Sequence, residues 1–242
     1  MTLAALVTGA AGGIGGAVCA ALLADGFHVL AVDREPVAAA EALVPHAAEL
    51  TDEAGAAAAV AAAEAAFGRL DLVFNGAGIS GRRLGDGPVE SIPREGWDAV
   101  LAANLTSTFL VCKHAVPALR RAGGGGIVNL ASVLGLVGGD ADFATHAYAA
   151  SKGAIVSLTR SMAVTYAPER IACNVVCPGL IATPMSARAQ GDERIAARLA
   201  ELQPLTGTFG RPEDVADAVA YLARAPFVTG TVLTVDGGWT AR

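Results

Sequence analysis

Residues 3–24 read LAALVTGAAGGIGGAVCAALLA, and this stretch decides the fold. The apolar run Leu3–Thr8 predicts a buried strand, and a glycine-rich turn and a helix-like run follow it. Gly9 allows a sharp turn, while Gly13 and Gly15 let the backbone approach a ligand closely. The start of a helix adds N–H donors and a positive dipole end. The stretch therefore predicts a pyrophosphate site, although its G-x-x-x-G-x-G spacing differs from the usual G-x-G-x-x-G.

The same alternation of strand-like and helix-like runs continues along the chain. The expected strands are Leu3–Thr8, His28–Val32, Leu70–Asn75, Gly126–Ala131, Ile171–Val176 and Thr231–Val235, with a shorter one at Ala47–Leu50. The expected helices are Ile14–Ala24, Pro36–Leu43, Glu53–Phe67, Arg94–Ala122, Tyr148–Tyr166, Asp192–Leu202 and Pro212–Ala223. Near-continuous apolar strands that alternate with helices are typical of a parallel sheet covered on both faces. We expect an α/β fold, in which residues 1–242 form a single Rossmann-like domain with a doubly wound sheet of about seven strands.

Three connections are longer than the fold needs. They span residues 76–93, 132–147 and 178–205, and each follows an expected strand. Ligands of open α/β sheets bind beyond the carboxyl ends of the strands. We therefore expect these loops to shape a substrate pocket.

The composition restricts the classes of partner. The net charge of −6 argues against nucleic acid, and no apolar run reaches the roughly 18 residues of a membrane span. The N-terminus shows no signal-peptide pattern, so a cytoplasmic protein is expected. Neither the histidines nor the cysteines have metal-ligand spacing, and buried free thiols are favoured for Cys19, Cys112, Cys173 and Cys177.

Asp33 ends the second expected strand. A carboxylate at this place can accept hydrogen bonds from an adenosine ribose and would repel a 2′-phosphate. Arg34 could instead pair with a 2′-phosphate, but no basic residue occurs inside the glycine loop. These residues favour NAD over NADP as cofactor.

Tyr148 and Lys152 carry the chemistry that the sequence predicts. Their spacing of four puts both side chains on one helix face. A free tyrosine, with a pKa of about 10, is a poor base at neutral pH, and a nearby cation would lower that pKa. Ser132 ends a strand and could hold a substrate oxygen, while Asn104 in an apolar helix needs a buried polar partner or a kinked helix with bound water.

At this point the chain resembles the classical short-chain dehydrogenase/reductase family over nearly its whole length. The family loop T-G-x-x-x-G-x-G corresponds to residues 8–15, its N-N-A-G segment to residues 75–78 and its P-G…T segment to residues 178–183. The family's catalytic tetrad falls on Asn104, Ser132, Tyr148 and Lys152. The V-D-G-G ending at residues 235–238 is also similar to the family's last strand and tail.

The resemblance implies a set of cofactor-binding residues. They are Gly9, Gly13, Ile14, Gly15, Asp33, Glu49, Leu50, Asn75, Gly76, Ala77, Tyr148, Lys152, Pro178, Gly179, Ile181 and Thr183. Two positions depart from the family pattern, since Gly76 replaces the second asparagine of N-N-A-G and Glu49 replaces the usual aspartate near the adenine. The resemblance further implies proton exchange by Tyr148 and a water-linked proton path through Asn104. It also implies a homotetramer, which the apolar excess of Arg94–Ala122 and Tyr148–Tyr166 supports.

The substrate is only coarsely predicted. Candidate contacts are Ser132, Leu134, His146, Tyr148 and Met185, and the pocket could suit a sugar, sugar acid, polyol or cyclic alcohol. Arginines at 82, 83, 188, 194 and 198 could meet an acidic substrate or lie on solvated helix faces. An NAD-dependent oxidoreductase acting on a secondary alcohol or ketone is the leading prediction. The alternatives are an NADPH-dependent 3-oxoacyl-carrier-protein reductase, a nicotinamide-using epimerase or lyase, and a non-catalytic dinucleotide-binding scaffold.

Overall fold

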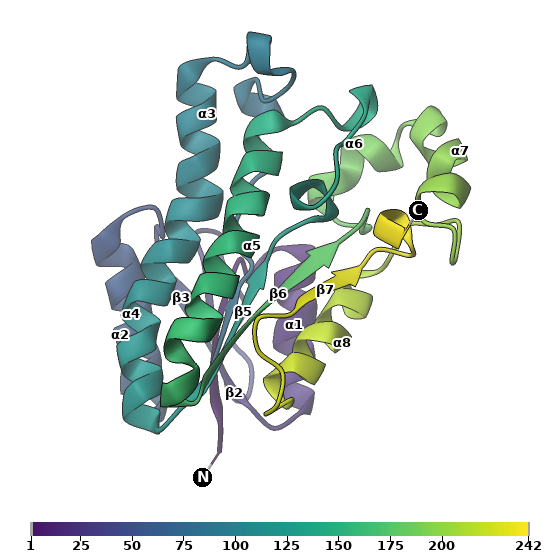
Figure 1. Ribbon diagram of the computed structural model, residues 1–242. Coiled ribbons are helices and arrows are strands. Elements are labelled where there is room, and N and C mark those ends of the chain that lie inside the picture. Colours follow the sequence, from purple (N-terminus) through teal and green to yellow (C-terminus); the bar gives the residue numbers. More distant parts are fainter. Residues whose placement is uncertain (1, 242) are drawn as a thin grey trace.

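The computed structural model describes residues 2–241 and has a layered α/β architecture (Figure 1). Seven parallel strands form one sheet in the order β3-β2-β1-β4-β5-β6-β7. The strands are β1 (Ala4–Thr8), β2 (His28–Asp33), β3 (Leu43–Ala47), β4 (Leu72–Asn75), β5 (Gly125–Leu130), β6 (Ile171–Pro178) and β7 (Val232–Val235). The expected doubly wound parallel sheet of about seven strands is confirmed.

Helices cover both faces of the sheet (Figure 1). One face is covered by α1 (Gly13–Ala24) and α8 (Pro212–Ala223), and the other by α2 (Glu53–Phe67), α4 (Ser107–Ala122) and α5 (His146–Tyr166). The remaining helices are α3 (Arg94–Leu101), which continues into α4, and α6 (Ala187–Gln190) and α7 (Glu193–Leu202), which lie beyond the ends of the strands.

The core explains why the strands read as continuous apolar runs. All five residues of β1 are buried, because α1 lies on one side of the strand and α2 and α4 lie on the other. The strand order reverses between β1 and β4, so the chain leaves these two strands in opposite directions. That reversal opens a crevice at their carboxyl ends, where open α/β sheets bind ligands.

The helix expected at Pro36–Leu43 is absent, and this prediction was wrong. Residues 36–39 have no regular structure, Ala40 bridges to Leu43, and Ala42 has a φ of 61°. The strand expected at Ala47–Leu50 instead occupies Leu43–Ala47, where it pairs with β2. Alanine has the highest intrinsic helix propensity, but such propensities are weak, and the hydrogen bonds of an added edge strand override them.

The long helical run from Arg94 to Ala122 is interrupted by a π turn at Ala102–Thr106. The hydroxyl groups of Ser107 and Thr108 donate to the carbonyl groups four residues earlier, at 2.6 and 2.8 Å. These bonds satisfy carbonyl groups where the turn widens. The run is long and apolar enough to pass a membrane-span criterion by length and composition, but half of its apolar window is buried in the protein as a core helix.

All four cysteines are free and buried, as the sequence predicts. Burial raises the pKa of Cys19, Cys112 and Cys173 to about 12 and that of Cys177 to about 11, so these thiols are protonated at neutral pH. Among residues 2–241 no group of histidine, cysteine and acidic side chains has the arrangement of a metal site.

Candidate active site

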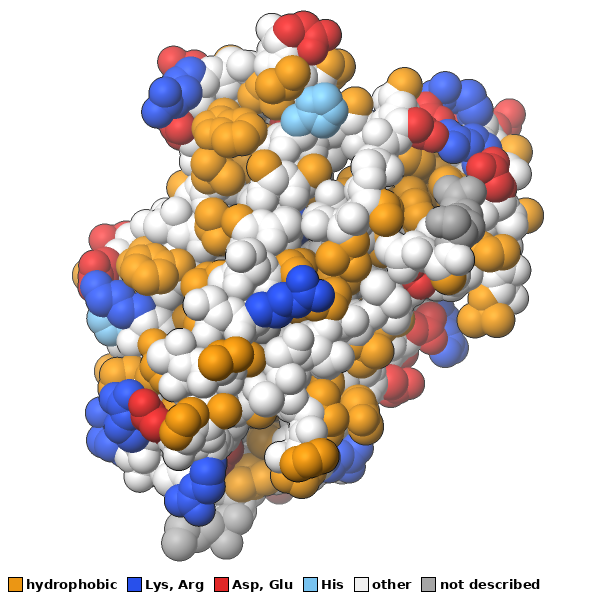
Figure 2. Space-filling model, viewed as in Figure 1, with side chains coloured by type: hydrophobic (Ala, Val, Ile, Leu, Met, Phe, Trp, Pro, Cys, Tyr) orange, Lys and Arg blue, Asp and Glu red, His pale blue; other side chains and the backbone are white. Residues whose placement is uncertain are grey.

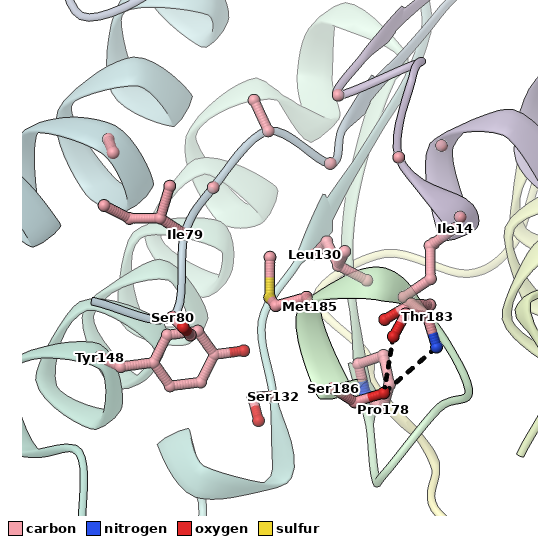
Figure 3. A pocket seen from close by; sticks show the side chains of 18 of the residues that line it. Ile14, Ile79, Ser80, Leu130, Ser132, Tyr148, Pro178, Thr183, Met185 and Ser186 are labelled. Atoms are coloured by element: carbon pink, nitrogen blue, oxygen red, sulfur yellow. Dashed lines mark hydrogen bonds between the residues drawn. The ribbon is translucent and has the colours of Figure 1, made fainter. Parts of the chain in front are cut away.

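A cavity of about 510 Å³ lies at the carboxyl ends of the central strands. One part, here called the glycine-loop end, is bounded by the loop after β1 and by Asp33 at the end of β2. The other part, the tyrosine end, is bounded by Ser132, Tyr148 and Met185 (Figure 3). The three long loops predicted to surround a substrate all contribute lining residues to this cavity.

The glycine loop is held in a conformation that excludes side chains. Gly9 has a φ of +71°, and a Cβ atom there would lie 2.8 Å from the backbone of Gly76 and Ala77. A Cβ atom on Gly15 would lie 2.0 Å from the carbonyl oxygen of Gly9. The first turn of α1 contains no acidic residue, and its N-cap Gly12 offers no side-chain acceptor. No side chain therefore neutralises the positive N-terminal end of α1, which a bound phosphate group could contact.

Asp33 is anchored at the same end of the cavity. Its two carboxylate oxygens accept hydrogen bonds from the backbone N–H groups of Ala11 and Glu35, each at 3.0 Å. The adjacent Arg34 pairs with Glu49 at 3.3 Å, so its charge is partly neutralised. Hydrogen bonds from Thr51, together with Arg34, hold the pKa of Glu49 below its usual value. The residues present fit the adenosine and pyrophosphate of a dinucleotide.

Tyr148 and Ser132 approach one another at the tyrosine end. Figure 3 shows the Tyr148 hydroxyl group and the Ser132 side chain facing a common space, with Met185 across it. Burial raises the pKa of Tyr148, and an interaction with the Ser132 hydroxyl group acts in the opposite direction. The expected lowering of this pKa by Lys152 is not seen: burial is the largest effect, and Ser132 is the group that lowers the pKa.

Lys152 is almost completely buried, with 4% of its surface exposed. Its Nζ atom donates a hydrogen bond of 2.8 Å to the carbonyl oxygen of Leu130 and lies 5.6 Å from the centre of the Tyr148 ring. Burial lowers the pKa of Lys152 to about 8. A buried lysine costs stability, so its retention beside a tyrosine in a cavity is typical of a functional site.

Asn104 lies in the π turn and is completely buried. Its side chain exchanges hydrogen bonds with both the N–H and the carbonyl group of Ile79, at 2.8 and 3.1 Å. It also donates to Ser151, whose hydroxyl group donates to the carbonyl oxygen of Tyr148 at 2.7 Å. Asn104 thus joins the loop after β4 to the first turns of α5, and it does not itself line the cavity.

Sequence reasoning missed Asp86, which holds the start of α5. The Asp86 carboxylate is buried and accepts hydrogen bonds from the backbone N–H groups of Ala147 and Tyr148, at 3.0 and 2.9 Å. It serves as a helix cap supplied from a distant loop. No local signal could have revealed it, because the usual capping position, Thr145, makes no such bond.

The structure brings together most, but not all, of the predicted site residues. The catalytic candidates Ser132, Tyr148 and Lys152 line the cavity, as do the predicted contacts Leu134 and Met185 and the predicted cofactor residues Gly9, Gly13, Ile14, Gly15, Asp33, Glu49, Leu50, Gly76, Ala77, Pro178, Gly179, Ile181 and Thr183. Further lining residues that the sequence did not indicate include Ser80, Phe143, Thr145, Ser186 and Trp239.

Two predicted contacts lie elsewhere. Asn75 is buried behind the cavity and donates to Asn129 at 2.8 Å, so it braces β4 against β5 instead of reaching a cofactor. His146 is exposed on the first turn of α5 and is not among the lining residues, because α5 turns its side chain outward. The replacement at Gly76 has a physical reason, since a Cβ atom there would lie 2.8 Å from the carbonyl oxygen of Thr8 and 2.4 Å from the Phe74 ring.

Comparison with known proteins decides the family. A family model described as "Enoyl-(Acyl carrier protein) reductase" matches residues 9–240. The chain belongs to the short-chain dehydrogenase/reductase family. A solved short-chain type dehydrogenase/reductase from Mycobacterium ulcerans has a TM-score of 0.91 and 32% identity, covering 99% of this chain and 90% of that one.

Relatives of this short-chain dehydrogenase/reductase are named as dehydrogenases of alcohols of several shapes, and one of them is named as inactive. The cis-4-hydroxycyclohexanecarboxylate dehydrogenase of Sinomonas cyclohexanicum is 40% identical, covering 98% of this chain and 96% of the relative. The D-threitol dehydrogenase of Mycolicibacterium smegmatis is 36% identical, with coverage of 98% and 93%. The "Inactive 2-(S)-hydroxypropyl-CoM dehydrogenase 2" of Xanthobacter autotrophicus is 46% identical, with coverage of 80% and 84%. The chain is thus an oxidoreductase of this family that acts on CH–OH donors.

The family binds a nicotinamide cofactor, and the comparisons leave the choice between NAD and NADP open. The solved structure of ElxO with NADP bound has a TM-score of 0.90 and 28% identity, and covers the whole of both chains. The choice in the present chain therefore depends on its own residues at the glycine-loop end.

Proposed function

We propose that this short-chain dehydrogenase/reductase is an NAD-dependent dehydrogenase of secondary alcohols. One observation carries the proposal: Tyr148, Ser132 and Lys152 line the same cavity as the glycine loop and Asp33. A proton-transfer group and a dinucleotide cradle that share one cavity fit hydride transfer at a carbon bearing a hydroxyl group.

Each side chain at the tyrosine end has a distinct role in this proposal. Tyr148 exchanges the proton of the substrate oxygen, and the Ser132 hydroxyl group holds that oxygen in place. Lys152 brings a cation beside the phenol, and Asn104 positions the loop after β4 against α5. The water-linked proton path through Asn104 stays a prediction. When bound, the nicotinamide supplies the hydride acceptor, and its chemistry belongs to the cofactor.

The remaining cofactor-binding roles follow from position. Gly9, Gly13, Ile14 and Gly15 would hold the pyrophosphate at the start of α1, and Asp33 would accept hydrogen bonds from the adenosine ribose. NAD is favoured because the Asp33 carboxylate would repel a 2′-phosphate, and because Arg34 is paired with Glu49. Thr183 and Ile181, which line the cavity, would hold the nicotinamide amide group.

The substrate class we propose is a small secondary alcohol, such as a polyol, sugar, sugar acid or cyclic alcohol. Both polar and apolar groups line the tyrosine end, with Ser132 opposite Met185 (Figure 3). An NADPH-dependent 3-oxoacyl-carrier-protein reductase is the less favoured alternative, because the glycine loop of this chain has no basic residue. A non-catalytic scaffold is also less favoured. Burial of Lys152 costs stability, and a scaffold gains no activity that would offset this cost.

We further propose a cytoplasmic homotetramer. Figure 2 shows hydrophobic side chains scattered over the face that α4 and α5 form. Phe109 on α4 and Val164 on α5 are 47% and 80% exposed, and burial of such side chains against another subunit would be favourable. Four free, buried cysteines suit a reducing compartment.

The proposal is tested by titrating the purified protein with NAD and with NADP, and then by following nicotinamide absorbance with a panel of secondary alcohols. We expect tighter binding of NAD and turnover with one alcohol class. In Asp33→Ser the preference for NAD over NADP should fall by about 10- to 100-fold, because loss of the charge removes repulsion of the 2′-phosphate. The absence of binding to either cofactor would overturn the proposal.

A further inference from the structure

The loops around the tyrosine end meet at one residue, Asp142. The backbone carbonyl oxygen of Asp142 accepts hydrogen bonds from Arg82 at 2.9 Å and from Arg188 at 3.0 Å. Arg82 comes from the loop after β4 and Arg188 from α6, and both arginines line the cavity. Two guanidinium groups from distant segments therefore converge on one neutral oxygen at the cavity wall.

The carboxylate of Asp142 forms no ion pair with either of these two cations. It is almost completely buried and is paired with Arg194 and Arg198 of α7, each at 2.5 Å. Arg198 also pairs with Asp140 at 2.5 Å. Figure 2 shows the basic and acidic side chains of this region side by side over α7. The carboxylates of Asp140 and Asp142 are thus occupied by other arginines, and that of Asp86 is occupied by the backbone N–H groups of Ala147 and Tyr148.

The charges of Arg82 and Arg188 are only weakly balanced by ion pairs. Within residues 2–241, Arg82 makes no ion pair, and Arg188 reaches a single carboxylate, that of Asp192, only at 3.9 Å. Burial, and after it the neighbouring Arg188 charge, lower the pKa of Arg82, whereas the more weakly acting charges of Asp86 and Asp142 raise it. Like charges that converge at a cavity wall repel one another unless an anion lies between them.

We propose that Arg82 and Arg188 form an anion-binding pair for the substrate, which is a secondary hydroxy acid or keto acid whose carboxylate or similar oxyanion lies away from the reacting carbon. The inference rests on the proposed dehydrogenase function and narrows its substrate class. Guanidinium groups bind carboxylates through paired, charge-assisted hydrogen bonds, which fix the orientation of the bound molecule. The anion would fix the far end of the substrate while Ser132 and Tyr148 meet the hydroxyl group.

The first test needs no turnover. In the presence of saturating nicotinamide dinucleotide, binding of cyclohexanecarboxylate is compared with binding of cyclohexanecarboxamide, which has the same shape but no charge. We expect the carboxylate to bind about 10- to 100-fold more tightly, the range for hydrogen bonds to charged groups. Equal affinities, or no detectable binding of the carboxylate at millimolar concentration, would overturn the proposal.

The second test uses variants with matched controls. Arg82→Gln and Arg188→Gln should each remove most of the preference for the carboxylate. Arg83→Gln changes an exposed neighbour outside the cavity and should retain the preference. Arg194→Gln breaks an ion pair with Asp142 without touching the cavity lining, and should also retain it. If Arg194→Gln has the same effect as Arg188→Gln, the arginines only brace the loops and the anion site is refuted.

The third test separates this inference from the proposed function. Turnover of 4-hydroxycyclohexanecarboxylate is compared with turnover of cyclohexanol, and the acid is expected to have the higher kcat/KM through a lower KM. Turnover of neutral alcohols without preference for any acid would refute the anion site and leave the dehydrogenase proposal standing. If the carboxylate binds at the arginine pair but no alcohol is oxidised with either cofactor, the proposed function fails and the anion site stands.

Discussion

The two ends of the cavity are built by different means. At the glycine-loop end, the backbone itself forms the surface, and a Cβ atom on Gly15 would lie 2.0 Å from the carbonyl oxygen of Gly9. At the tyrosine end, long side chains from separate loops hold the wall together through Asp142. Backbone packing allows few alternatives, whereas a wall of ion pairs can be rebuilt by substitution. We therefore expect cofactor binding to tolerate substitution less than substrate choice does.

The largest effect is expected at Tyr148, in the tyrosine end. Tyr148→Phe removes the hydroxyl group that exchanges the proton, so turnover should fall by about 10²- to 10⁴-fold. Binding of the dinucleotide should change by less than about twofold, because the glycine-loop end is intact. Stopped-flow kinetics and a cofactor titration measure the two quantities. Tyr166→Phe, at the other end of α5, is the matched control, and retention of most activity by Tyr148→Phe would remove Tyr148 from its proposed role.

The second prediction tests the rigidity of the glycine-loop end. Gly15→Ala should lower the free energy of unfolding by about 1–3 kcal/mol, the usual cost of overpacking, and should abolish tight cofactor binding. Gly16→Ala is the matched control in the next position, since its Cβ atom would lie no closer than 3.6 Å to Ala10. Denaturant unfolding of both variants gives the comparison. Equal stabilities would show that the loop can relax, and would break the contrast between the two ends.

The third prediction uses the buried charge of Lys152. Its pKa is lowered from 10.5 to about 8, so the folded protein holds the proton less tightly than the unfolded chain. Lys152→Met should raise stability below pH 8 by about 2–3 kcal/mol, while activity is lost. Between pH 8 and 10.5 the unfolded chain binds more protons, so the stability of the unsubstituted protein rises with pH.

The advantage of the methionine should therefore shrink across this window and vanish above pH 10.5. Thermal unfolding of the two proteins at matched pH values measures it. A constant difference from pH 7 to pH 10.5 would mean that the charge of Lys152 costs nothing in the fold.

The smallest effect compares two helix caps. Asp86 caps α5 at the tyrosine end, and Asp192 caps α7 by accepting from Arg194 and Ile195. Replacement of either aspartate by alanine should cost about 1 kcal/mol of stability. Only Asp86→Ala should also lower kcat, because α5 carries Tyr148. Unfolding curves and steady-state kinetics of both variants decide this, and an equal change in kcat would show that α5 is held by its packing alone.

The sequence predicts the glycine loop and the main side chains of the tyrosine end well, but it predicts the long-range contacts that hold the tyrosine end together poorly, for a physical reason. Sites made of consecutive residues, such as residues 9–15 or the Tyr148–Lys152 pair, leave a local pattern. Asp86 acts on residues 61 and 62 positions away, and the arginine pair converges only after folding. The spacing of residues along the sequence does not reveal such long-range pairings.

The missing helix at Pro36–Leu43 has a related cause. A local preference of its alanines predicts a helix, but the pairing of β3 with β2 is decided by the rest of the sheet. The sequence predicts a kinked helix only as one way to satisfy Asn104, and it does not predict the π turn, because the sequence does not show where a helix widens.

The π turn also sets the rotational phase between α3 and α4. Each residue of an α-helix turns the chain by about 100°, so the wider turn at Ala102–Thr106 rotates α4 relative to a regular continuation of α3. Loss of a single residue there would swing the buried side of α4, which includes Ala115 and Leu119, away from the sheet or carry Asn104 away from α5. Evolution can therefore substitute residues in this turn but cannot shorten it. An alignment of homologues should show no gaps across these five positions, with variation at the four positions other than Asn104.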